Sequence, residues 1–86
     1  MESGYNVVKL EILKEIEGLG ETTIVEVNDN LGRIYVNTAM AMLRYHRSGL
    51  LSRSGVNRKN KIYALTDRGH ERLEWLIELN PEEDLT

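Results

Sequence analysis

Residues 37–51 of this chain read NTAMAMLRYHRSGLL, and the fold is best worked out from this stretch. Wound as a helix at about 100° per residue, it separates into two faces. The apolar face is made by Thr38, Ala41, Met42 and Tyr45, and is widened by Ala39, Leu43 and His46. The opposite face is made by Asn37, Met40, Arg44, Arg47 and Ser48. Gly49 is expected to end the helix in the left-handed conformation that glycine adopts there.

The second face of this helix carries the side chains best suited to nucleic acid. Asn and Arg have the shape to read base edges and to hold phosphates. A helix that packs on the protein through an apolar face and exposes a face with Asn and Arg is typical of a DNA-reading helix. An ordinary amphipathic surface helix fits the same pattern, so the stretch alone leaves both interpretations open.

Length and composition predict a small globular protein. With 86 residues the chain is expected to form one domain over residues 1–86, with its core in 5–79 and an acidic tail in 80–86. It has no cysteine, which excludes disulfides, zinc fingers and thiol catalysis. It has no apolar run of about 18 residues and no N-terminal basic-then-apolar pattern, so we expect neither a membrane span nor a signal peptide. A cytoplasmic protein is the expectation.

Charge is segregated along the chain. Residues 1–32 carry a net charge of −5, residues 33–72 carry +7 and residues 73–86 carry −5, which together give −3. A basic block of this kind between acidic arms indicates a surface for a polyanion, even in an acidic protein.

The segments before the helix predicted in residues 37–48 are also expected to be helical. Ser3 or Asn6 caps a helix that runs to about Glu17, and Gly18–Gly20 makes a turn. Its core face is predicted to hold Tyr5, Val8, Ile12, Leu13, Ile16 and Leu19, leaving Val7 and Leu10 off that face. Residues 21–31 suit a short helix capped by Thr22 or Thr23, although the β-branched run in residues 22–27 would suit a strand equally well.

After Gly49 we expect a β-hairpin and a last helix. The hairpin arms are residues 50–54 and 62–65, and its polar tip is residues 55–61. Thr66 is the expected N-cap of a helix that stops at Asn80–Pro81. Its predicted inward face is His70, Leu73, Leu76 and Ile77. Trp75 and Leu79 lie on nearly the opposite side, and with Val7 and Leu10 they form a predicted homodimer interface.

Short sequence anchors in this order resemble the winged helix-turn-helix domains of small prokaryotic regulators such as the MarR, PadR and ArsR groups. The anchors are Leu31–Gly32, Met42, Tyr45, residues 48–51 (SGLL), and Tyr63-x-Leu65-Thr66-x-x-Gly69. Two features depart from the pattern: Asn28 replaces a small apolar residue, and residues 33–36 (RIYV) replace a Ser/Thr-rich entry to the third helix. Asn28 is expected to mean either a looser second helix or a polar contact there.

The resemblance implies an α+β, mainly α fold of three helices, a hairpin wing and a C-terminal helix. It also implies a transcriptional regulator that binds double-stranded DNA, with residues 36–48 in the major groove and the wing, residues 50–65, on the backbone. Asn37 could pair with adenine and Arg44 with guanine. The full set of predicted DNA-binding residues is Arg33, Tyr35, Asn37, Met40, Arg44, Arg47, Arg53, Arg58, Lys59 and Lys61.

Patterns for other chemistry are weak in this sequence. The two histidines, His46 and His70, show no paired metal-ligand spacing, and there is no phosphate-binding glycine loop or nucleophile turn. We therefore expect no enzyme activity, no metal and no cofactor. A winged-helix protein-interaction module without nucleic acid is the main alternative. Single-stranded nucleic acid binding is a weaker one, because only Tyr35 is placed for base stacking.

Overall fold

A computed structural model describes residues 4–57 and 59–79, without the side chains of residues 4–6 and 57. The elements are α1 (Gly4–Leu19), α2 (Ile24–Leu31), α3 (Tyr35–Arg47), β1 (Leu51–Asn57), β2 (Asn60–Leu65) and α4 (Asp67–Leu79). This order confirms the predicted mainly helical α+β fold. No helix within the described residues is both long enough and apolar enough to cross a membrane. The predicted caps at Ser3 or Asn6, the side chain of Tyr5, the stop at Asn80–Pro81 and the tail 80–86 lie outside the described residues.

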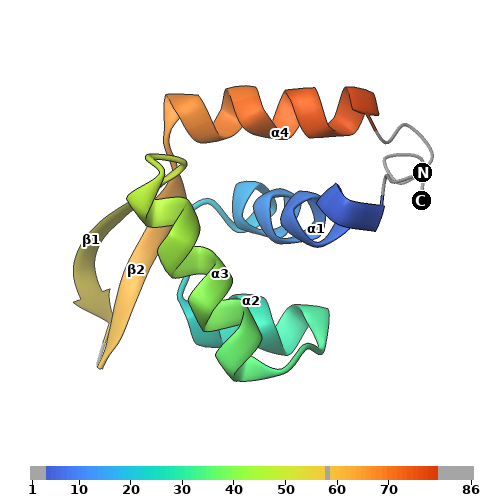
Figure 1. The fold of residues 1–86 in the computed structure, drawn as a ribbon. Coiled ribbons are helices and arrows are strands. Elements are labelled where there is room, and N and C mark those ends of the chain that lie inside the picture. The colour runs from blue at the N-terminus through green and yellow to red at the C-terminus, as the bar shows by residue number, and fades with distance from the viewer. Residues whose placement is uncertain (1–3, 58, 80–86) are drawn as a thin grey trace.

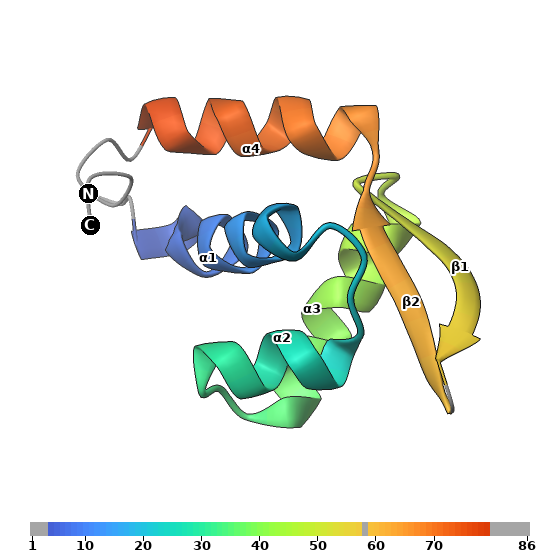
Figure 2. The ribbon, with the colours of Figure 1, turned by 180° about the vertical axis from the view of Figure 1, so that it is seen from behind.

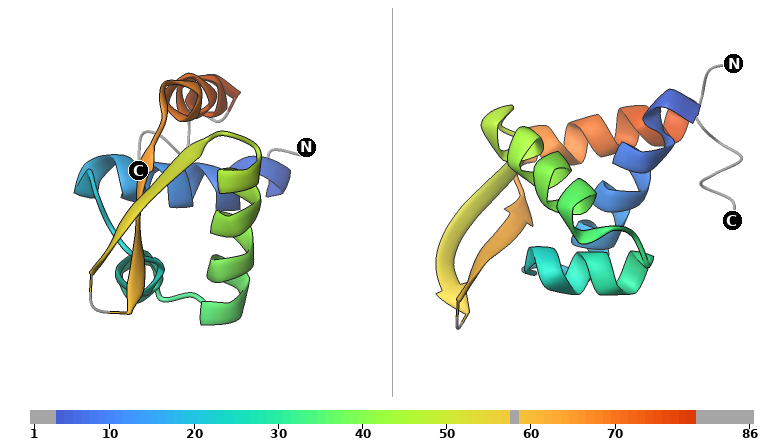
Figure 3. Two further views of the ribbon diagram at one scale, coloured as in Figure 1. Left: turned by 90° about the vertical axis from the view of Figure 1, so that its left-hand side faces the viewer. Right: turned by 60° about the horizontal axis from the view of Figure 1, so that its bottom comes forward.

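The helices pack around α1. On one side α4 runs alongside α1, and on the other side lie α2 and α3, which pack on each other (Figures 1 and 2). The antiparallel hairpin β1–β2 closes one end of the molecule beside α3. The N-terminal end of α3 and the tip of the hairpin both point away from α4 (Figure 3).

Residues 22–31 resolve the choice between helix and strand. The Thr23 hydroxyl accepts a hydrogen bond from the Glu26 backbone N–H at 3.2 Å, and Gly32 ends α2 with φ +65°. The helix prediction is therefore confirmed. Thr22, just before it, forms a single antiparallel β-pair with Tyr63, with N···O distances of 2.9 and 2.7 Å. This pair ties the start of α2 to β2.

The hairpin is longer than predicted. β1 and β2 pair from Leu51–Leu65 out to Asn57–Asn60, so most of the predicted tip is strand. The register shifts between Ser54 and Val56, where Gly55 takes φ +55°. A β-bulge with glycine in the left-handed conformation allows the strands to pair on both sides of the extra residue. The sequence alone predicted residue 55 as the start of the loop.

The exit from α3 and the entry to α4 are joined by hydrogen bonds. Gly49 has φ +84°, its N–H donates to the His46 carbonyl at 3.0 Å, and the Leu50 N–H donates to the Tyr45 carbonyl at 2.9 Å. This is the Schellman pattern expected of a glycine-terminated helix.

Thr66 caps α4 as predicted and ties it to that exit. Its hydroxyl accepts from the Gly69 N–H at 3.0 Å and donates to the Gly49 carbonyl, while its N–H donates to the Leu50 carbonyl at 3.0 Å. Gly69 is needed because a Cβ there would lie 2.1 Å from the Leu50 oxygen.

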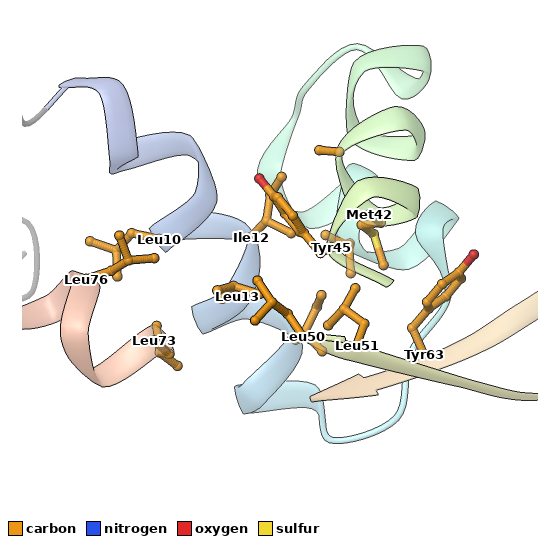
Figure 4. Packing of buried hydrophobic residues seen from close by; sticks show 13 residues of the cluster. Leu10, Ile12, Leu13, Met42, Tyr45, Leu50, Leu51, Tyr63, Leu73 and Leu76 are labelled. Atoms are coloured by element: carbon orange, nitrogen blue, oxygen red, sulfur yellow. The ribbon is translucent and has the colours of Figure 1, made fainter. Parts of the chain in front are cut away.

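One hydrophobic core joins all six elements. It is formed by Leu10, Ile12, Leu13, Ile16, Val27, Ala41, Met42, Tyr45, Leu50, Leu51, Tyr63, Leu73 and Leu76. In Figure 4 the side chains of Leu10 and Leu76 lie together between α1 and α4. Burial of these side chains is the main stabilising contribution to the fold.

Three predictions about which side chains face the core were wrong. Leu10 is only 1% exposed, so it belongs to the core and not to a dimer interface. Val8 is 37% exposed and so lies outside the core. His70 is also exposed, and its Nδ1 lies 3.6 Å from a carboxylate oxygen of Glu17 on α1.

Candidate nucleic-acid interface

The outward face of α3 carries the side chains that the helical wheel placed there. Asn37, Met40, Arg44 and Arg47 are exposed. The docking face, made by Thr38, Ala41, Met42 and Tyr45, is buried. The two-faced character of this helix is therefore confirmed, and its polar side is free to meet a ligand.

A buried hydrogen bond fixes α3 against α2. The Thr38 hydroxyl donates to Oδ1 of Asn28 at 2.7 Å, and Thr38 is 1% exposed. Asn28 therefore makes a polar contact, one of the two outcomes expected of its departure from the family pattern. Because a buried polar group must be satisfied, this bond specifies how the two helices sit.

The turn between α2 and α3 is tied to α1 by surface contacts. Nη1 of Arg33 lies 3.1 Å from a carboxylate oxygen of Glu11, and Nδ2 of Asn30 lies 2.8 Å from one of Glu15. Arg33 is thus already paired with an acid in the free protein, unlike the other described cations on the predicted list.

The hairpin packs against α3 and carries three of the predicted cations. Side chains alternate along a strand, so Arg53 and Lys61 share a face with Tyr63. That face contacts α3, because the rings of Tyr63 and His46 are 6.3 Å apart at 85°. Arg53, Lys59 and Lys61 are all exposed. Arg58, the remaining predicted cation of this segment, lies outside the described residues.

A second basic group, formed by Lys9, Arg44 and Arg72, lies on α1, α3 and α4 and was not predicted from the sequence. Nζ of Lys9 sits 5.3 Å from the centre of the Tyr45 ring, and the guanidinium of Arg72 sits 5.3 Å from the centre of the Trp75 ring. Burial lowers the pKa of Lys9, and the nearby charges of Arg72 and Arg44 lower it further. Three helices therefore bring like charges together here, and these three cations have no acidic partner among the described residues.

The missed cluster had no signal in the linear charge pattern. Lys9 lies in the acidic first segment, and Arg72 lies about two turns from the hairpin along the predicted last helix. Only the packing of α1 against α4 and the contact of Lys9 with Tyr45 on α3 bring them to Arg44. Arg44 therefore belongs with Lys9 and Arg72, whereas Arg53, Lys59 and Lys61 lie on the hairpin.

The predicted dimer residues also separate. Trp75 and Leu79 are 48% and 49% exposed on α4, and Val7 is partly exposed on α1. Leu10, the fourth residue of that prediction, is in the core. Trp75 and Leu79 are one helical turn apart and share a face of α4, so they form a continuous apolar strip there.

The histidines do not form a metal site within residues 4–57 and 59–79. Nδ1 of His46 lies 3.0 Å from the Leu51 carbonyl oxygen, so that nitrogen carries the hydrogen in this contact. No group of three or more metal-ligating side chains was found among the described residues.

Solved structures with the same architecture are known. MarR from Escherichia coli, in its oxidised form, superposes on 84% of this chain with a TM-score of 0.74 at 21% sequence identity. BpsR of Bordetella bronchiseptica, whose DNA binding is regulated by 6-hydroxynicotinic acid, superposes on 88% with a TM-score of 0.76 at 17% identity. The fold is a winged helix-turn-helix. In it α2 and α3 are the helix-turn-helix and β1–β2 is the wing, as the resemblance implied.

The winged helix-turn-helix accounts for about half of each of these proteins, since the matched regions cover 52% of MarR and 55% of BpsR. No protein-family model and no curated protein sequence matches the chain. At these identities the likeness establishes the fold, and function has to be argued from the site.

Proposed function

We propose that this chain is a DNA-binding transcriptional regulator that acts in the cytoplasm as a homodimer and has no enzyme activity. One observation carries the proposal: the exposed face of α3 and the exposed cations Arg53, Lys59 and Lys61 lie on neighbouring elements. A helix in the major groove with a basic wing beside it is a known way to bind duplex DNA. MarR and BpsR, which share the fold, support this reading.

Roles follow from side-chain chemistry and position. Asn37 is proposed to read adenine, because its amide can bond adenine in two places at once. Arg47 and the wing cations, with Arg58 among them, are proposed to hold phosphates, which position the protein without specifying sequence. Arg44 lies near Lys9 and Arg72, and therefore suits a phosphate as well as the guanine first assigned to it. Arg33, paired with Glu11, and Tyr35 remain proposed contacts at the turn.

The first test is a fluorescence anisotropy titration of the chain with duplex DNA over a range of salt concentrations. Phosphate contacts release counterions, so the logarithm of the affinity should fall linearly with the logarithm of salt, by about 0.9 per contact. Absence of any binding tighter than about 100 μM at low salt, the weak end of non-specific binding, would contradict the proposal.

A wing variant sharpens that test. Lys61→Ala should weaken binding to all duplexes alike and reduce the salt slope by about one. Lys14→Ala removes the same charge from α1, an element to which we assign no DNA contact, and should leave the slope unchanged. Equal effects of both changes would show that only net charge matters and that the wing has no special place.

The homodimer is proposed from the exposed strip of α4. Trp75 and Leu79 carry large apolar surfaces, and Arg72 and Glu78 flank them on the same helix. Two antiparallel copies of α4 that meet at Trp75 would set Arg72 of one chain opposite Glu78 of the other. A self-complementary patch of this kind is what a two-fold interface requires.

A protein-interaction module is the second candidate, and the same exposed strip favours it. A subunit of a larger complex would use Trp75 and Leu79 to hold a different protein. It would then show no duplex affinity in the salt titration, which separates it from the regulator.

A further inference from the structure

The end of α3 that points away from α4 is apolar, which is unusual for the leading end of a DNA-reading helix. Ile34, Val36 and Met40 are 69%, 59% and 56% exposed, and Tyr35 is also exposed. These four residues hold the largest exposed fractions among the large apolar side chains around α3, and they follow one another within two helical turns. The arginines Arg44 and Arg47 lie in the other half of the helix.

Val36 and Met40 are neighbours on the surface of α3. Residues four apart lie one above the other on a helix, and Leu43, which is partly exposed, continues the same row. Arg47 is the next residue of that row towards the C-terminus. This row of α3 is therefore apolar at the N-terminal end of the helix and cationic at the C-terminal end.

Polar groups border this apolar row. Asn37 is exposed next to it on α3, and the wing, with Arg53 and Lys61, lies on the side of α3 that carries His46. An apolar row with an amide on one side and cations on the other matches the floor of the major groove. There the thymine C5 methyl is the apolar group, base edges offer hydrogen bonds and phosphates line the groove. A protein partner would have to supply acids for the wing cations and for Arg47 beside the apolar row, so the charges favour duplex DNA.

We propose that Val36 and Met40 pack against thymine C5 methyl groups and make the binding site of this protein thymine-dependent, with Ile34 covering the entry to the groove. The inference rests on the proposed DNA-binding function. It extends that function by naming the chemical group on DNA that is recognised, the thymine C5 methyl, and the side chains that recognise it, Val36 and Met40. It also gives the replacement of the usual Ser/Thr-rich helix entry by residues 33–36 a physical role.

The experiment compares methylated and unmethylated versions of one duplex. The highest-affinity site is first recovered by selection from a random duplex pool with the full chain. Each thymine is then replaced by deoxyuridine, which lacks only the C5 methyl. We expect one or two positions where the replacement weakens binding about fourfold, the effect of exposing one buried methyl group.

A double-mutant cycle assigns the methyl groups to side chains. Met40→Ala should weaken binding to the thymine duplex and remove the thymine–uracil difference at one position. Val36→Ala should do so at another, because the lost methyl no longer has a partner. The control is Val8→Ala, which trims another exposed valine, on α1, and should leave the thymine–uracil difference intact.

Two kinds of result would overturn the inference, and only the second would also overturn the proposed DNA-binding function. Tight duplex binding with no loss on uracil replacement, or a selected site without thymine, refutes the methyl contact and leaves the DNA-binding function standing. No duplex binding at all refutes both, and the apolar end of α3 would then be a surface for a protein partner.

Discussion

At the scale of single residues, Gly69 is the position least able to change. Gly69→Ala would place a methyl group on the Leu50 carbonyl oxygen, which already accepts the Thr66 N–H. We expect a loss of about 3 kcal/mol in the free energy of unfolding, typical of overpacking, measured by urea denaturation. The control, Gly18→Ala, meets nothing within 4 Å. It should raise stability by about 0.5 kcal/mol, since alanine is the better helix former. Equal effects would refute the close contact.

The Asn28–Thr38 hydrogen bond gives a second prediction for single residues. Thr38→Val leaves Asn28 Oδ1 without its donor and should cost about 1–2 kcal/mol in unfolding free energy. Asn28→Ala should cost a similar amount. The double variant should lose less than the sum, because the second change removes a group that the first had left unpaired. Strictly additive losses in urea denaturation would mean that the two side chains are not coupled.

Residues whose role depends on local chemistry were predictable from the sequence. Gly49 and Thr66 occupy their expected cap positions because capping needs only nearby backbone groups. Leu10 and His70 were misplaced because a helical wheel shows which residues share a face but not how far a neighbouring helix covers it. α4 covers Leu10 of α1, whereas His70 on α4 is left exposed beside Glu17 of α1.

At the scale of elements, the meeting of α1, α3 and α4 makes Lys9 an electrostatic cost. Burial and two like charges lower the pKa of Lys9 from 10.5. Lys9→Met keeps most of the apolar stem on Tyr45 and removes the charge. It should stabilise the protein by about 0.5 kcal/mol at neutral pH, the size usual for partly exposed positions.

The stability difference between wild type and Lys9→Met should shrink as pH rises towards 10.5. Between the lowered folded-state pKa of Lys9 and the unfolded value, the unfolded chain binds more protons, so the wild type gains stability with pH. Burial raises the pKa of Tyr45, which acts in the opposite direction above pH 10, but it does so in both proteins. Urea denaturation across this range measures the difference. A difference that stays constant would show that Lys9 titrates normally.

Element identity was predictable where two signals agreed and ambiguous where they did not. Residues 22–27 have β-branched side chains, yet a threonine cap and a glycine stop make a helix from residue 24 onward. The strand reading survives only at Thr22, whose partner, Tyr63, is 41 residues away in the sequence. A pairing over that distance leaves no local pattern. The charge cluster of Lys9, Arg44 and Arg72 could not be predicted for the same reason, since its members are far apart in the sequence.

At the scale of the whole molecule, the proposed dimer predicts a change in mass. The wild type should sediment as two chains, and Trp75→Glu should sediment as one, because a charge at the centre of an apolar contact must be desolvated. Val25→Glu is the control, since it places the same charge on an exposed valine of α2. A wild type that sediments as a single chain at all concentrations would remove the dimer from the proposal.

The hydrogen bonds of Thr66 to Gly49 and Leu50 have a consequence for the DNA site that the proposed dimer would bind. They hold the exit of α3 to the entry of α4, so two copies joined through α4 would carry their reading helices at one fixed separation and phase. Half-sites should then recur at one helical turn of B-DNA, about 10 base pairs, or a multiple of it. Inserting about five base pairs between them would turn the second half-site to the opposite side of the duplex. The second α3 of the proposed dimer could not contact it there, so binding should weaken.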